Sequence, residues 1–364
     1  MKSICFIVHN INGSGGDTRV ATTIINGLVK TMDCKITVFS IESAKKYRKN
    51  TFHLDPKVNI VYVTEKINNL KKEIIPLSLR IKEYIKNERF DVLVVSGMDF
   101  VPFVLPSFNH LKNTKKIAWD HMNYKVGHIT SLLGIGRRIA IKSFDRIVVL
   151  TDRDKTTYLA SDRNLENKVV RIYNPIDIVG TERLNYDSSI KKIVSCGLLV
   201  EQKGFDYAIQ IASRLAKRHP DWSWDIWGDG PLRSTLEDMI KVNGLEGYVQ
   251  LKGYTDNMLE KYKNYSIFAL TSRFEGFGMV LAEALKYGIP SVSFDIDAGP
   301  SEMIENNING FLVPSFNIQA FANSLSELMI HSEKRILFSQ YAHNRIAQMD
   351  SSTAIHSWGK LITD

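Results

Sequence analysis

Cysteine is scarce in this sequence. The 364 residues include three, Cys5, Cys34 and Cys196, and they stand far apart. Disulfide frameworks and structural zinc sites need several cysteines at short, regular spacings, so both are excluded. Two of the three lie inside apolar runs, and we expect all three to be reduced thiols, mostly buried.

Long apolar runs are also missing. Nowhere do about 18 consecutive apolar residues occur, so no transmembrane helix is predicted. Residues 1–10 hold a short apolar run without a small-residue cleavage site, which favours a first β-strand over a signal peptide. Repeats and low-complexity segments are absent too. A hydrophobic content of 44% and a charged content of 24% are typical of a globular protein.

Acidic residues are few in the first half of the chain. Residues 1–180 carry 29 Lys and Arg against 17 Asp and Glu, whereas residues 181–364 carry 18 against 22. A basic half can bind nucleic acid, anionic lipid or a phosphorylated substrate. No zinc-finger, homeodomain or aromatic RNA-binding motif accompanies the charge, so we predict no nucleic acid and favour an anionic membrane surface. The alternative is ordinary lysine on solvated faces.

Strand and helix patterns alternate along the chain. Strands are predicted at 3–10, 35–41, 58–63 and 92–96, and the pattern restarts with a strand at 192–196. Such alternation favours parallel sheets covered by helices. At about 150 residues per domain the length suggests two domains.

We therefore predict an α/β fold of two doubly wound parallel-sheet domains. The boundaries are 1–180 for the first and 181–342 for the second, with a last helix over 343–364 that packs back on the first domain. The polar stretch up to Ser189 is the expected linker, because Asn174 and Pro175 break the preceding strand.

The clearest chemical signal lies in residues 271–290. A buried strand runs into this stretch and a helix-forming segment follows. Glycines at 276 and 278 let the backbone turn and approach a ligand, and the amides at the helix start then attract phosphate. Glu275 before the helix and Glu283 two turns inside it can face one cleft. Two glutamates at this spacing also occur by chance, so the flanking residues decide.

Those flanking residues resemble a known family. Glu-x7-Glu with Gly-Phe-Gly inside it, followed by Ala-Leu-x-x-Gly-x-Pro, strongly resembles the donor-site signature of the retaining glycosyltransferases of family 4. The resemblance covers nearly the whole second half and thinly covers the first. It implies the GT-B fold, in which two Rossmann-like domains face a cleft, with the acceptor on the first half and the nucleotide sugar on the second.

Shorter segments support the resemblance. Residues 15–19 are similar to the family's Gly-Gly-x-x-Arg, residues 121–123 to its His-x-Asn, and residues 228–231 to its Gly-x-Gly-Pro. One position departs from the pattern: Leu198 stands where the family usually has an arginine on the donor phosphates. We expect this to weaken the grip on the diphosphate by about 1–3 kcal/mol unless Arg273 or Arg19 compensates.

The resemblance assigns roles to matching residues. Lys203 and the helix start at Gly278 take the phosphates, Glu283 binds ribose, and Glu275 and His121 position the sugar. The predicted catalytic residues are Glu275, His121 and Lys203. The predicted donor-binding residues are Gly15, Gly16, Arg19, Gly197, Lys203, Gly228, Tyr254, Glu275, Gly276, Phe277, Gly278, Met279, Val280 and Glu283. From position alone His121 and Tyr254 have structural alternatives, since a lone histidine or tyrosine is often a packing residue.

The expected activity is retaining transfer of a hexose from a nucleotide sugar, a UDP-hexose by preference. The expected acceptor is the sugar hydroxyl of an undecaprenyl-linked oligosaccharide in capsule or O-antigen synthesis. The family uses no metal, and the Asp-x-Asp at 295–297 follows a strand and fits cleft lining better than metal binding. The expected location is cytoplasmic, peripheral at the inner face of the membrane. A catalytically weak nucleotide-sugar-binding subunit, a transferase with a soluble acceptor and an epimerase of the same shape are the alternatives.

Residues 127–143 offer one candidate membrane contact. Isoleucines and leucines alternate there with Arg137, Arg138 and Lys142. This pattern suits a basic amphipathic helix on a membrane. The glycines at 134 and 136 weaken a helix, so a docking loop is the second interpretation and a core helix the third.

Overall fold

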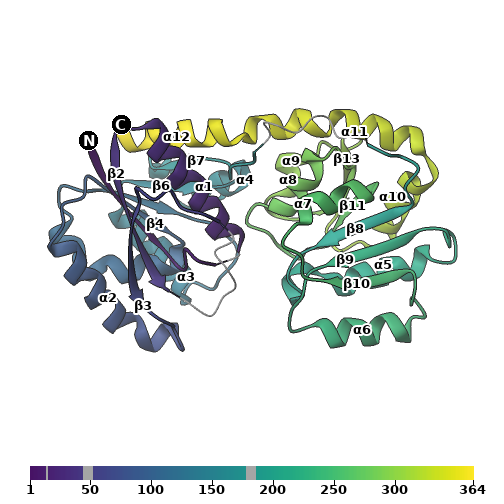
Figure 1. The fold of residues 1–364 in the computed structure, drawn as a ribbon, viewed down its shortest axis with the longest axis horizontal. Helices are drawn as coiled ribbons and strands as arrows, with labels where there is room; N and C mark the ends of the chain where they lie inside the picture. The colour runs from purple at the N-terminus through teal and green to yellow at the C-terminus, as the bar shows by residue number, and fades with distance from the viewer. Residues whose placement is uncertain (14, 44–51, 178–185) are drawn as a thin grey trace. The chain divides into compact units, whose positions relative to one another are not determined.

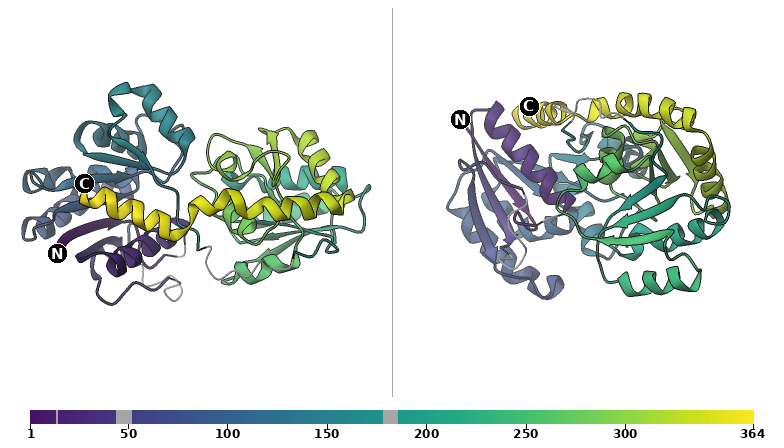
Figure 2. Two further views of the ribbon diagram at one scale, coloured as in Figure 1. Left: turned by 90° about the horizontal axis from the view of Figure 1, so that it is seen from above. Right: turned by 45° about the vertical axis from the view of Figure 1, so that its right-hand side comes forward.

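The computed structural model describes residues 1–13, 15–43, 52–177 and 186–364. The chain divides into two compact units, one formed by Met1–Pro175 with Ser351–Asp364 and the other by Ile176–Asp350. Figure 1 colours the chain from purple to yellow, and Figure 2 gives two further views. The predicted boundary at residue 180 lies outside the described residues.

The first unit is built on a seven-stranded parallel sheet in the order β3-β2-β1-β4-β5-β6-β7. The strands are β1 (Lys2–Val8), β2 (Cys34–Glu42), β3 (Asn59–Thr64), β4 (Val92–Ser96), β5 (Lys115–Trp119), β6 (Arg146–Val149) and β7 (Val169–Arg171). Helices and 3₁₀ turns of this unit are α1 (Gly16–Thr31), α2 (Leu70–Lys86), η1 (Met98–His110), α3 (Leu132–Ser143), α4 (Asp152–Ser161), η2 (Arg163–Leu165) and α12 (Ser351–Thr363).

The second unit repeats this arrangement with six parallel strands in the order β10-β9-β8-β11-β12-β13. The strands are β8 (Lys192–Cys196), β9 (Ser223–Trp227), β10 (Val249–Gly253), β11 (Ile267–Leu270), β12 (Ser291–Asp295) and β13 (Gly310–Pro314). The helices and 3₁₀ turns are η3 (Glu201–Lys203), α5 (Phe205–Leu215), α6 (Arg233–Val242), α7 (Met258–Lys261), η4 (Tyr262–Asn264), α8 (Met279–Lys286), α9 (Pro300–Met303), α10 (Ile318–Ile330), α11 (Ser332–Ile346) and η5 (Ala347–Met349).

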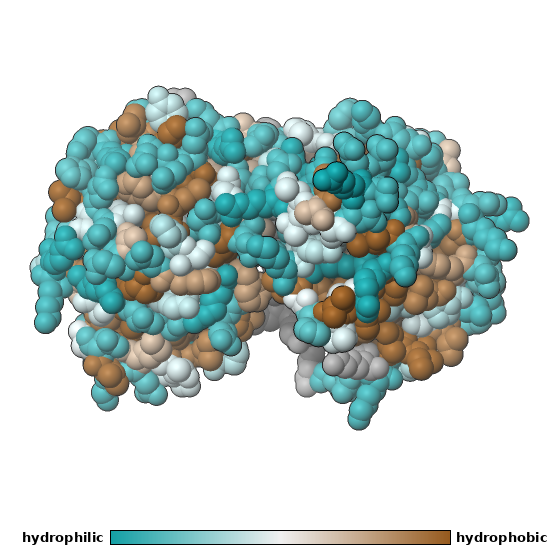
Figure 3. All heavy atoms as spheres, turned by 180° about the vertical axis from the view of Figure 1, so that it is seen from behind, coloured by the Kyte–Doolittle hydropathy of each residue, from teal (hydrophilic) through white to brown (hydrophobic). Residues whose placement is uncertain are grey.

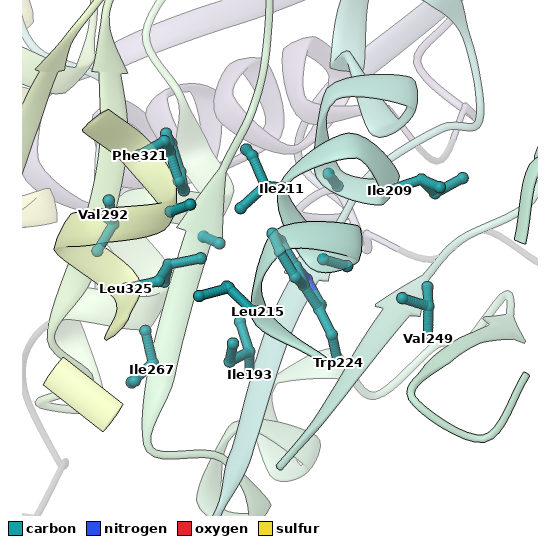
Figure 4. Close-up of a cluster of buried hydrophobic side chains, with 14 of the residues drawn as sticks. Ile193, Ile209, Ile211, Leu215, Trp224, Val249, Ile267, Val292, Phe321 and Leu325 are labelled. Carbon is teal, nitrogen blue, oxygen red and sulfur yellow. The ribbon is translucent and has the colours of Figure 1, made fainter. Parts of the chain in front are cut away.

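Each sheet is buried by apolar residues on its strands and helices. In the second unit Trp224 of β9 lies beneath Leu215 of α5, and Phe321 and Leu325 of α10 point at the same core (Figure 4). Strands of parallel sheets are buried on both faces, which is why they are continuous apolar runs in the sequence. The predicted α/β fold of two doubly wound parallel sheets is confirmed.

The C-terminal segment differs from the prediction of one helix over 343–364. The chain is helical to Ile346 in α11, passes through η5 and begins a new helix at Ser351. Asp350 lies in the break, with φ −57° and ψ 143°, because it forms a bridge with Ile176 instead of continuing the helix. The last helix, α12, belongs to the first unit, where Trp358 packs on Trp119 with ring centroids 4.6 Å apart.

None of the helices within the described ranges combines the length and the apolarity needed to cross a bilayer.

Candidate active site

The strand order of the second sheet reverses between β8 and β11. In open parallel sheets, ligands bind beyond the carboxyl ends of the strands at such a reversal. Two loops meet there: residues 197–204 leave β8 and residues 271–278 leave β11. These are the two segments that carry the predicted donor-binding residues Lys203 and Glu275.

A buried ion pair joins the two loops. Nζ of Lys203 lies 2.7 Å from Oε1 of Glu275, and both side chains are largely shielded from water. The hydroxyl of Ser272 donates to the same oxygen at 2.7 Å. Lys203 and Glu275, which are predicted to bind adjacent parts of one donor, are therefore within hydrogen-bond distance of each other. Because both are shielded from water, the attraction between their charges is weakly screened.

Backbone contacts hold the two loops together. Gly204 has a left-handed φ of 61°, and a Cβ there would lie 2.2 Å from the carbonyl oxygen of Thr271. The amide of Arg273 donates to the carbonyl of Gln202 at 2.7 Å, and Nε2 of Gln202 donates to the carbonyl of Phe274 at 3.1 Å. Only glycine permits this approach, so Gly204 sets the spacing between the lysine loop and the glutamate loop.

Gly197 and Gly228 have a related role. A Cβ on Gly197 would lie 3.3 Å from the aliphatic stem of Lys203, so its absence leaves room for that side chain. A Cβ on Gly228 would lie 1.9 Å from the carbonyl oxygen of Gly197. Both glycines therefore permit the close packing of the backbone around Lys203, while their contact with a donor stays a prediction.

Arg273 does not replace the missing arginine at position 198. Its guanidinium donates two hydrogen bonds of 2.7 Å to the two carboxylate oxygens of Asp206 and lies over the ring of Tyr207. This bidentate pair uses the guanidinium to attach the β11 loop to the start of α5. Leu198 itself is 60% exposed just after β8, so the position expected to hold a cation presents an apolar side chain.

The start of α8 has the geometry of an anion site. Gly278 occupies the N-cap with φ 91° and ψ 52°, and no side chain caps the helix. Met279 and Val280 form the first turn, where backbone amides point away from the helix. Gly276 and Phe277 lead into this turn, and Phe277 is buried, with its carbonyl oxygen so near Gly299 that a Cβ there would lie 2.2 Å away.

Glu283 lies on the second turn of α8 and is buried. The hydroxyl of Tyr262 is 3.5 Å from Oε2 of Glu283 and donates at 3.2 Å to the carbonyl of Val280. Sγ of Cys196, at the end of β8, lies 3.1 Å from the same hydroxyl. Burial raises the pKa of Cys196 to about 12, so this thiol is protonated and can donate to Tyr262.

Tyr254 follows the edge strand β10 and is exposed. Its ring is therefore accessible at the carboxyl edge of the second sheet. Its stacking on a base stays a prediction.

The remaining predicted residues lie in the first unit. Gly15 is the N-cap of α1 in an extended conformation and Gly16 is the first helical residue. The amide of Arg19 donates to the carbonyl of Gly15 at 3.1 Å, so Arg19 lies one turn inside the helix. Neither glycine has a positive φ, and their presence here is explained by the turn into α1, not by backbone strain.

His121 follows β5 and is held by a neighbouring strand end. Its Nε2 lies 2.8 Å from the hydroxyl of Ser96, the last residue of β4, and its ring centroid is 4.4 Å from that of Trp119. Burial lowers the pKa of the His121 imidazole, against the opposing influence of Asp17 and Asp120. The ring is therefore neutral near pH 7.

The loop around His121 is organised by Arg137, which is 4% exposed. Its Nε donates to Asp120 at 2.7 Å, and its Nη atoms donate to the carbonyls of four loop residues. The four are Met122, Asn123, Tyr124 and Val126. A buried arginine with this many partners has a structural role.

One face of α3 packs against the core, and membrane contact of residues 127–143 stays a prediction. Helix α3 begins at Leu132, and a Cβ on Gly136 would lie 1.7 Å from the carbonyl oxygen of Met98 in η1. Glycine is needed at 136 because the two backbones pack together, and Arg137 points inward. The core-helix alternative describes α3.

Sequence reasoning gave no site role to four residues that hold the predicted ones: Ser96, Arg137, Tyr262 and Ser272. Ser272 lies within the 271–290 stretch, three residues before Glu275, and Arg137 was interpreted as part of a membrane contact. For Ser96, the one available signal was its position at a strand end of a parallel sheet.

Comparisons with known proteins show what this chain is similar to. Residues 182–345 match the family model Glycosyl transferases group 1. An uncharacterized glycosyltransferase of Haemophilus influenzae is 28% identical over 358 residues, covering 98% of this chain and 99% of the relative. The amylovoran biosynthesis glycosyltransferase AmsD of Erwinia amylovora is 26% identical, with complete coverage of both chains.

A solved structure shares the whole fold. A crystal structure of S. aureus TarM, in complex with fondaparinux, α-GlcNAc-glycerol and UDP, superposes with a TM-score of 0.84 at 17% identity and covers 100% of both chains. The predicted GT-B fold and the predicted enzyme class are thus confirmed. Residues 182–345 are thus similar to a glycosyl transferases group 1 domain, the chain has the GT-B fold, and its enzyme class is that of the hexosyltransferases.

Proposed function

We propose that this enzyme transfers a hexose from a UDP-sugar to a sugar hydroxyl of a lipid-linked acceptor, with retention of the anomeric configuration. The observation that carries the proposal is the buried pair of Lys203 and Glu275, 2.7 Å apart beside the uncapped start of α8. It places a cation suited to a diphosphate next to a carboxylate suited to sugar hydroxyls. The UDP bound by TarM and the amylovoran role of AmsD support the donor and the polysaccharide pathway.

The reaction breaks the bond between the anomeric carbon and the diphosphate oxygen. Negative charge develops on the departing diphosphate, where Lys203 and the first amides of α8 stabilise it. Glu275 orients the sugar, the acceptor oxygen forms the new bond, and its proton passes to the leaving phosphate. In this proposal no metal is needed, because Lys203 and the helix start supply positive charge.

His121 keeps its predicted role as a sugar-binding residue in this proposal. A neutral imidazole has one nitrogen that donates and one that accepts, and because Nε2 lies 2.8 Å from the Ser96 hydroxyl, Nδ1 is the nitrogen that this proposal assigns to a sugar hydroxyl. Its contact with Ser96 holds the ring in one orientation.

The first test is UDP or GDP release from a panel of nucleotide sugars, with and without a lipid-linked acceptor extract. We expect one UDP-sugar to be consumed only with the acceptor. Glu275→Ala should lower the rate at least about 100-fold, a loss comparable to that of an oxyanion-stabilising group. Glu246→Ala, which removes an exposed glutamate of the same unit, is the matched control.

Binding without turnover under every condition would instead support the nucleotide-sugar-binding subunit. Turnover with a soluble glycan in place of the lipid extract would support the soluble-acceptor alternative. Conversion of the donor without any acceptor would support the epimerase.

Attachment to the inner face of an anionic membrane is the second part of the proposal, and helix α2 is the surface we assign to it. On α2, Ile75 is 69% exposed and Leu79, one turn later, is 52% exposed. Lys72, Arg80 and Lys86 are exposed on the same helix, and Lys86 forms an ion pair with the exposed Glu83. An apolar ridge with three cations and one paired carboxylate beside it matches the interface of an anionic bilayer. On the face drawn in Figure 3, apolar residues gather in patches between polar ones.

Cosedimentation with vesicles tests this surface. Wild-type protein should bind phosphatidylglycerol vesicles and not phosphatidylcholine vesicles. The double variant Ile75→Ser/Leu79→Ser should bind about tenfold more weakly, because two apolar side chains no longer enter the interface. Ile330→Ser, at an equally exposed isoleucine of the second unit, is the control. Equal binding by all three proteins would reject α2 as the membrane surface.

A further inference from the structure

A buried tyrosine connects three parts of the donor site. Tyr262 belongs to η4, immediately before β11, and is 0% exposed. Its hydroxyl contacts Cys196 at the end of β8, the carbonyl of Val280 in the first turn of α8, and the carboxylate of Glu283. A buried hydroxyl costs free energy unless it is hydrogen-bonded, so its partners fix its position.

The ring of Tyr262 cannot easily move. It packs edge-on against Phe268 of β11, with centroids 6.3 Å apart, and lies 5.6 Å from the ring of Tyr287 after α8. The hydroxyl is thus held at a fixed point between β8 and α8. Burial raises the pKa of Tyr262 well above its ordinary value, so the hydroxyl keeps its one proton, which it shares between the Val280 carbonyl at 3.2 Å and the Glu283 carboxylate at 3.5 Å.

Glu283 depends on this arrangement. Its side chain is 6% exposed, and the Tyr262 hydroxyl lies 3.5 Å from its Oε2. The orientation of a buried carboxylate follows from the donors near it.

We propose that Tyr262 is a positioning residue for donor binding: it holds the Glu283 carboxylate in the orientation that accepts the hydroxyls of the nucleotide ribose. The inference rests on the proposed function, because it needs a nucleotide at this site. Tyr262 touches neither donor nor acceptor, and it acts through Glu283 and through the first turn of α8. Cys196 supports it from the opposite side by donating its thiol proton.

The test measures the affinity of UDP and of 2′,3′-dideoxy-UDP by calorimetry. Tyr262→Phe removes the hydroxyl and keeps the ring, and we expect it to weaken UDP binding about three- to tenfold, the effect of one lost hydrogen bond. The dideoxy nucleotide, which has no ribose hydroxyls, should bind wild type and Tyr262→Phe equally. With a turned-over donor, KM should rise by the same factor while kcat stays nearly unchanged.

Tyr265→Phe is the matched control. Its hydroxyl is also buried before β11, but it bonds to Nε1 of Trp227 and to Asp225 instead of Glu283. A general loss of packing would weaken binding in both variants, whereas positioning of Glu283 would weaken it in Tyr262→Phe alone.

The double variant Tyr262→Phe/Glu283→Ala separates the inference from the proposed function. If Tyr262 acts through Glu283, the double variant binds UDP as Glu283→Ala does. Additive losses, or equal losses with the dideoxy nucleotide, would overturn the role of Tyr262 and leave the donor site intact. No effect of Glu283→Ala on UDP binding would overturn the ribose assignment and the role of Tyr262 with it.

Discussion

The two sheets share one strand order over six strands, with a seventh strand, β7, at the end of the first, yet their carboxyl edges are built differently. At the reversal of the second sheet, opposite charges meet across two loops in Lys203 and Glu275. At the corresponding edge of the first sheet, a neutral His121 rests on Ser96, and the charged groups Asp120 and Arg137 are buried in a closed network behind it. The same topology therefore supports an ion pair between two loops in one unit and a neutral histidine held by a serine in the other.

The difference follows from which charged side chains are already hydrogen-bonded within the protein. Arg137 donates its N–H groups to Asp120 and to loop carbonyls. It therefore stabilises the His121 loop and is not available to bind a charged ligand. Lys203 pairs with the carboxylate of Glu275 at the carboxyl edge of the sheet, where the strand order reverses. A diphosphate bound at this edge can compete with Glu275 for the lysine. A charged residue is thus informative about ligands only after its partners in the fold are known.

The largest effect should come from breaking the closed network of the first unit. Arg137→Met leaves Asp120 buried without its cation and should lower the free energy of unfolding by about 3–5 kcal/mol. Urea unfolding monitored by fluorescence measures this. Arg138→Met changes the exposed neighbour on the same helix and should shift stability by less than about 0.5 kcal/mol. Similar losses in both variants would show that Arg137 is not the element that organises the loop.

The next effect concerns the loop junction of the second unit. Gly204 and Gly244 have nearly identical φ angles, 61° and 62°, but a Cβ meets the Thr271 carbonyl at the first and nothing within 4 Å at the second. Gly244→Ala should therefore lower the free energy of unfolding by about 1 kcal/mol, the strain of a left-handed alanine. Gly204→Ala should lower it by about 3 kcal/mol, because the lysine and glutamate loops must separate. The same separation should reduce the affinity for UDP at least tenfold. Equal losses in Tm and affinity would contradict the proposed junction.

A pH-dependent effect should come from Asp154 beside the same network. Burial raises the pKa of Asp154 to about 6, while hydrogen bonds from Thr151 and the amide of Tyr124 oppose the shift. The unfolded carboxyl loses its proton near pH 4 and the folded one near pH 6, so the wild type loses stability from this group as pH rises through that window. The free energy of unfolding of Asp154→Asn, relative to that of wild type, should therefore rise by about 2 kcal/mol between pH 4 and pH 6.5.

The measurement is the free energy of urea unfolding at half-unit pH steps. Asp152→Asn removes an exposed carboxylate from the same helix and provides the control. A difference between Asp154→Asn and wild type that does not change with pH would show that the folded carboxyl is already ionised at pH 4.

The smallest effect should come from adding a cation at position 198 of the second unit. Leu198→Arg restores the cation that the family pattern places beside Lys203, and Arg273 cannot supply it while it is paired with Asp206. UDP should bind about five- to tenfold more tightly at low salt, with the gain shrinking as salt is raised. Leu198→Gln, of similar length and without charge, should leave the affinity unchanged. No gain with arginine would mean that the diphosphate does not pass this position.

Much of the fold was predictable because its strands are continuous apolar runs. The prediction at 92–96 coincides with β4, and those at 35–41 and 58–63 differ from β2 and β3 by one or two residues. The long 3₁₀ segment η1 was not predicted, because Pro102 and Pro106 remove backbone donors and leave no helical period to find. The break at Asp350 also escaped prediction, since it depends on pairing with Ile176, far away in the sequence.

The candidate site was predictable only where its residues are close in sequence. The stretch from Glu275 to Glu283 contains its own glycine turn and helix start, so its chemistry is visible locally. The pairing of Lys203 with Glu275 spans 72 positions, and the contact of Ser96 with His121 spans 25. Such contacts follow from the order of strands in a sheet, which a single sequence does not specify.

The position of α12 has a consequence for the order of synthesis. The second unit is one continuous stretch, Ile176–Asp350, whereas the first unit is completed by Ser351–Asp364. Nζ of Lys115, at the start of β5, donates to the carbonyl of Leu361 at 2.6 Å. The first unit can therefore complete its fold only after the whole second unit has been synthesised, whereas the second unit needs no residue of Ser351–Asp364.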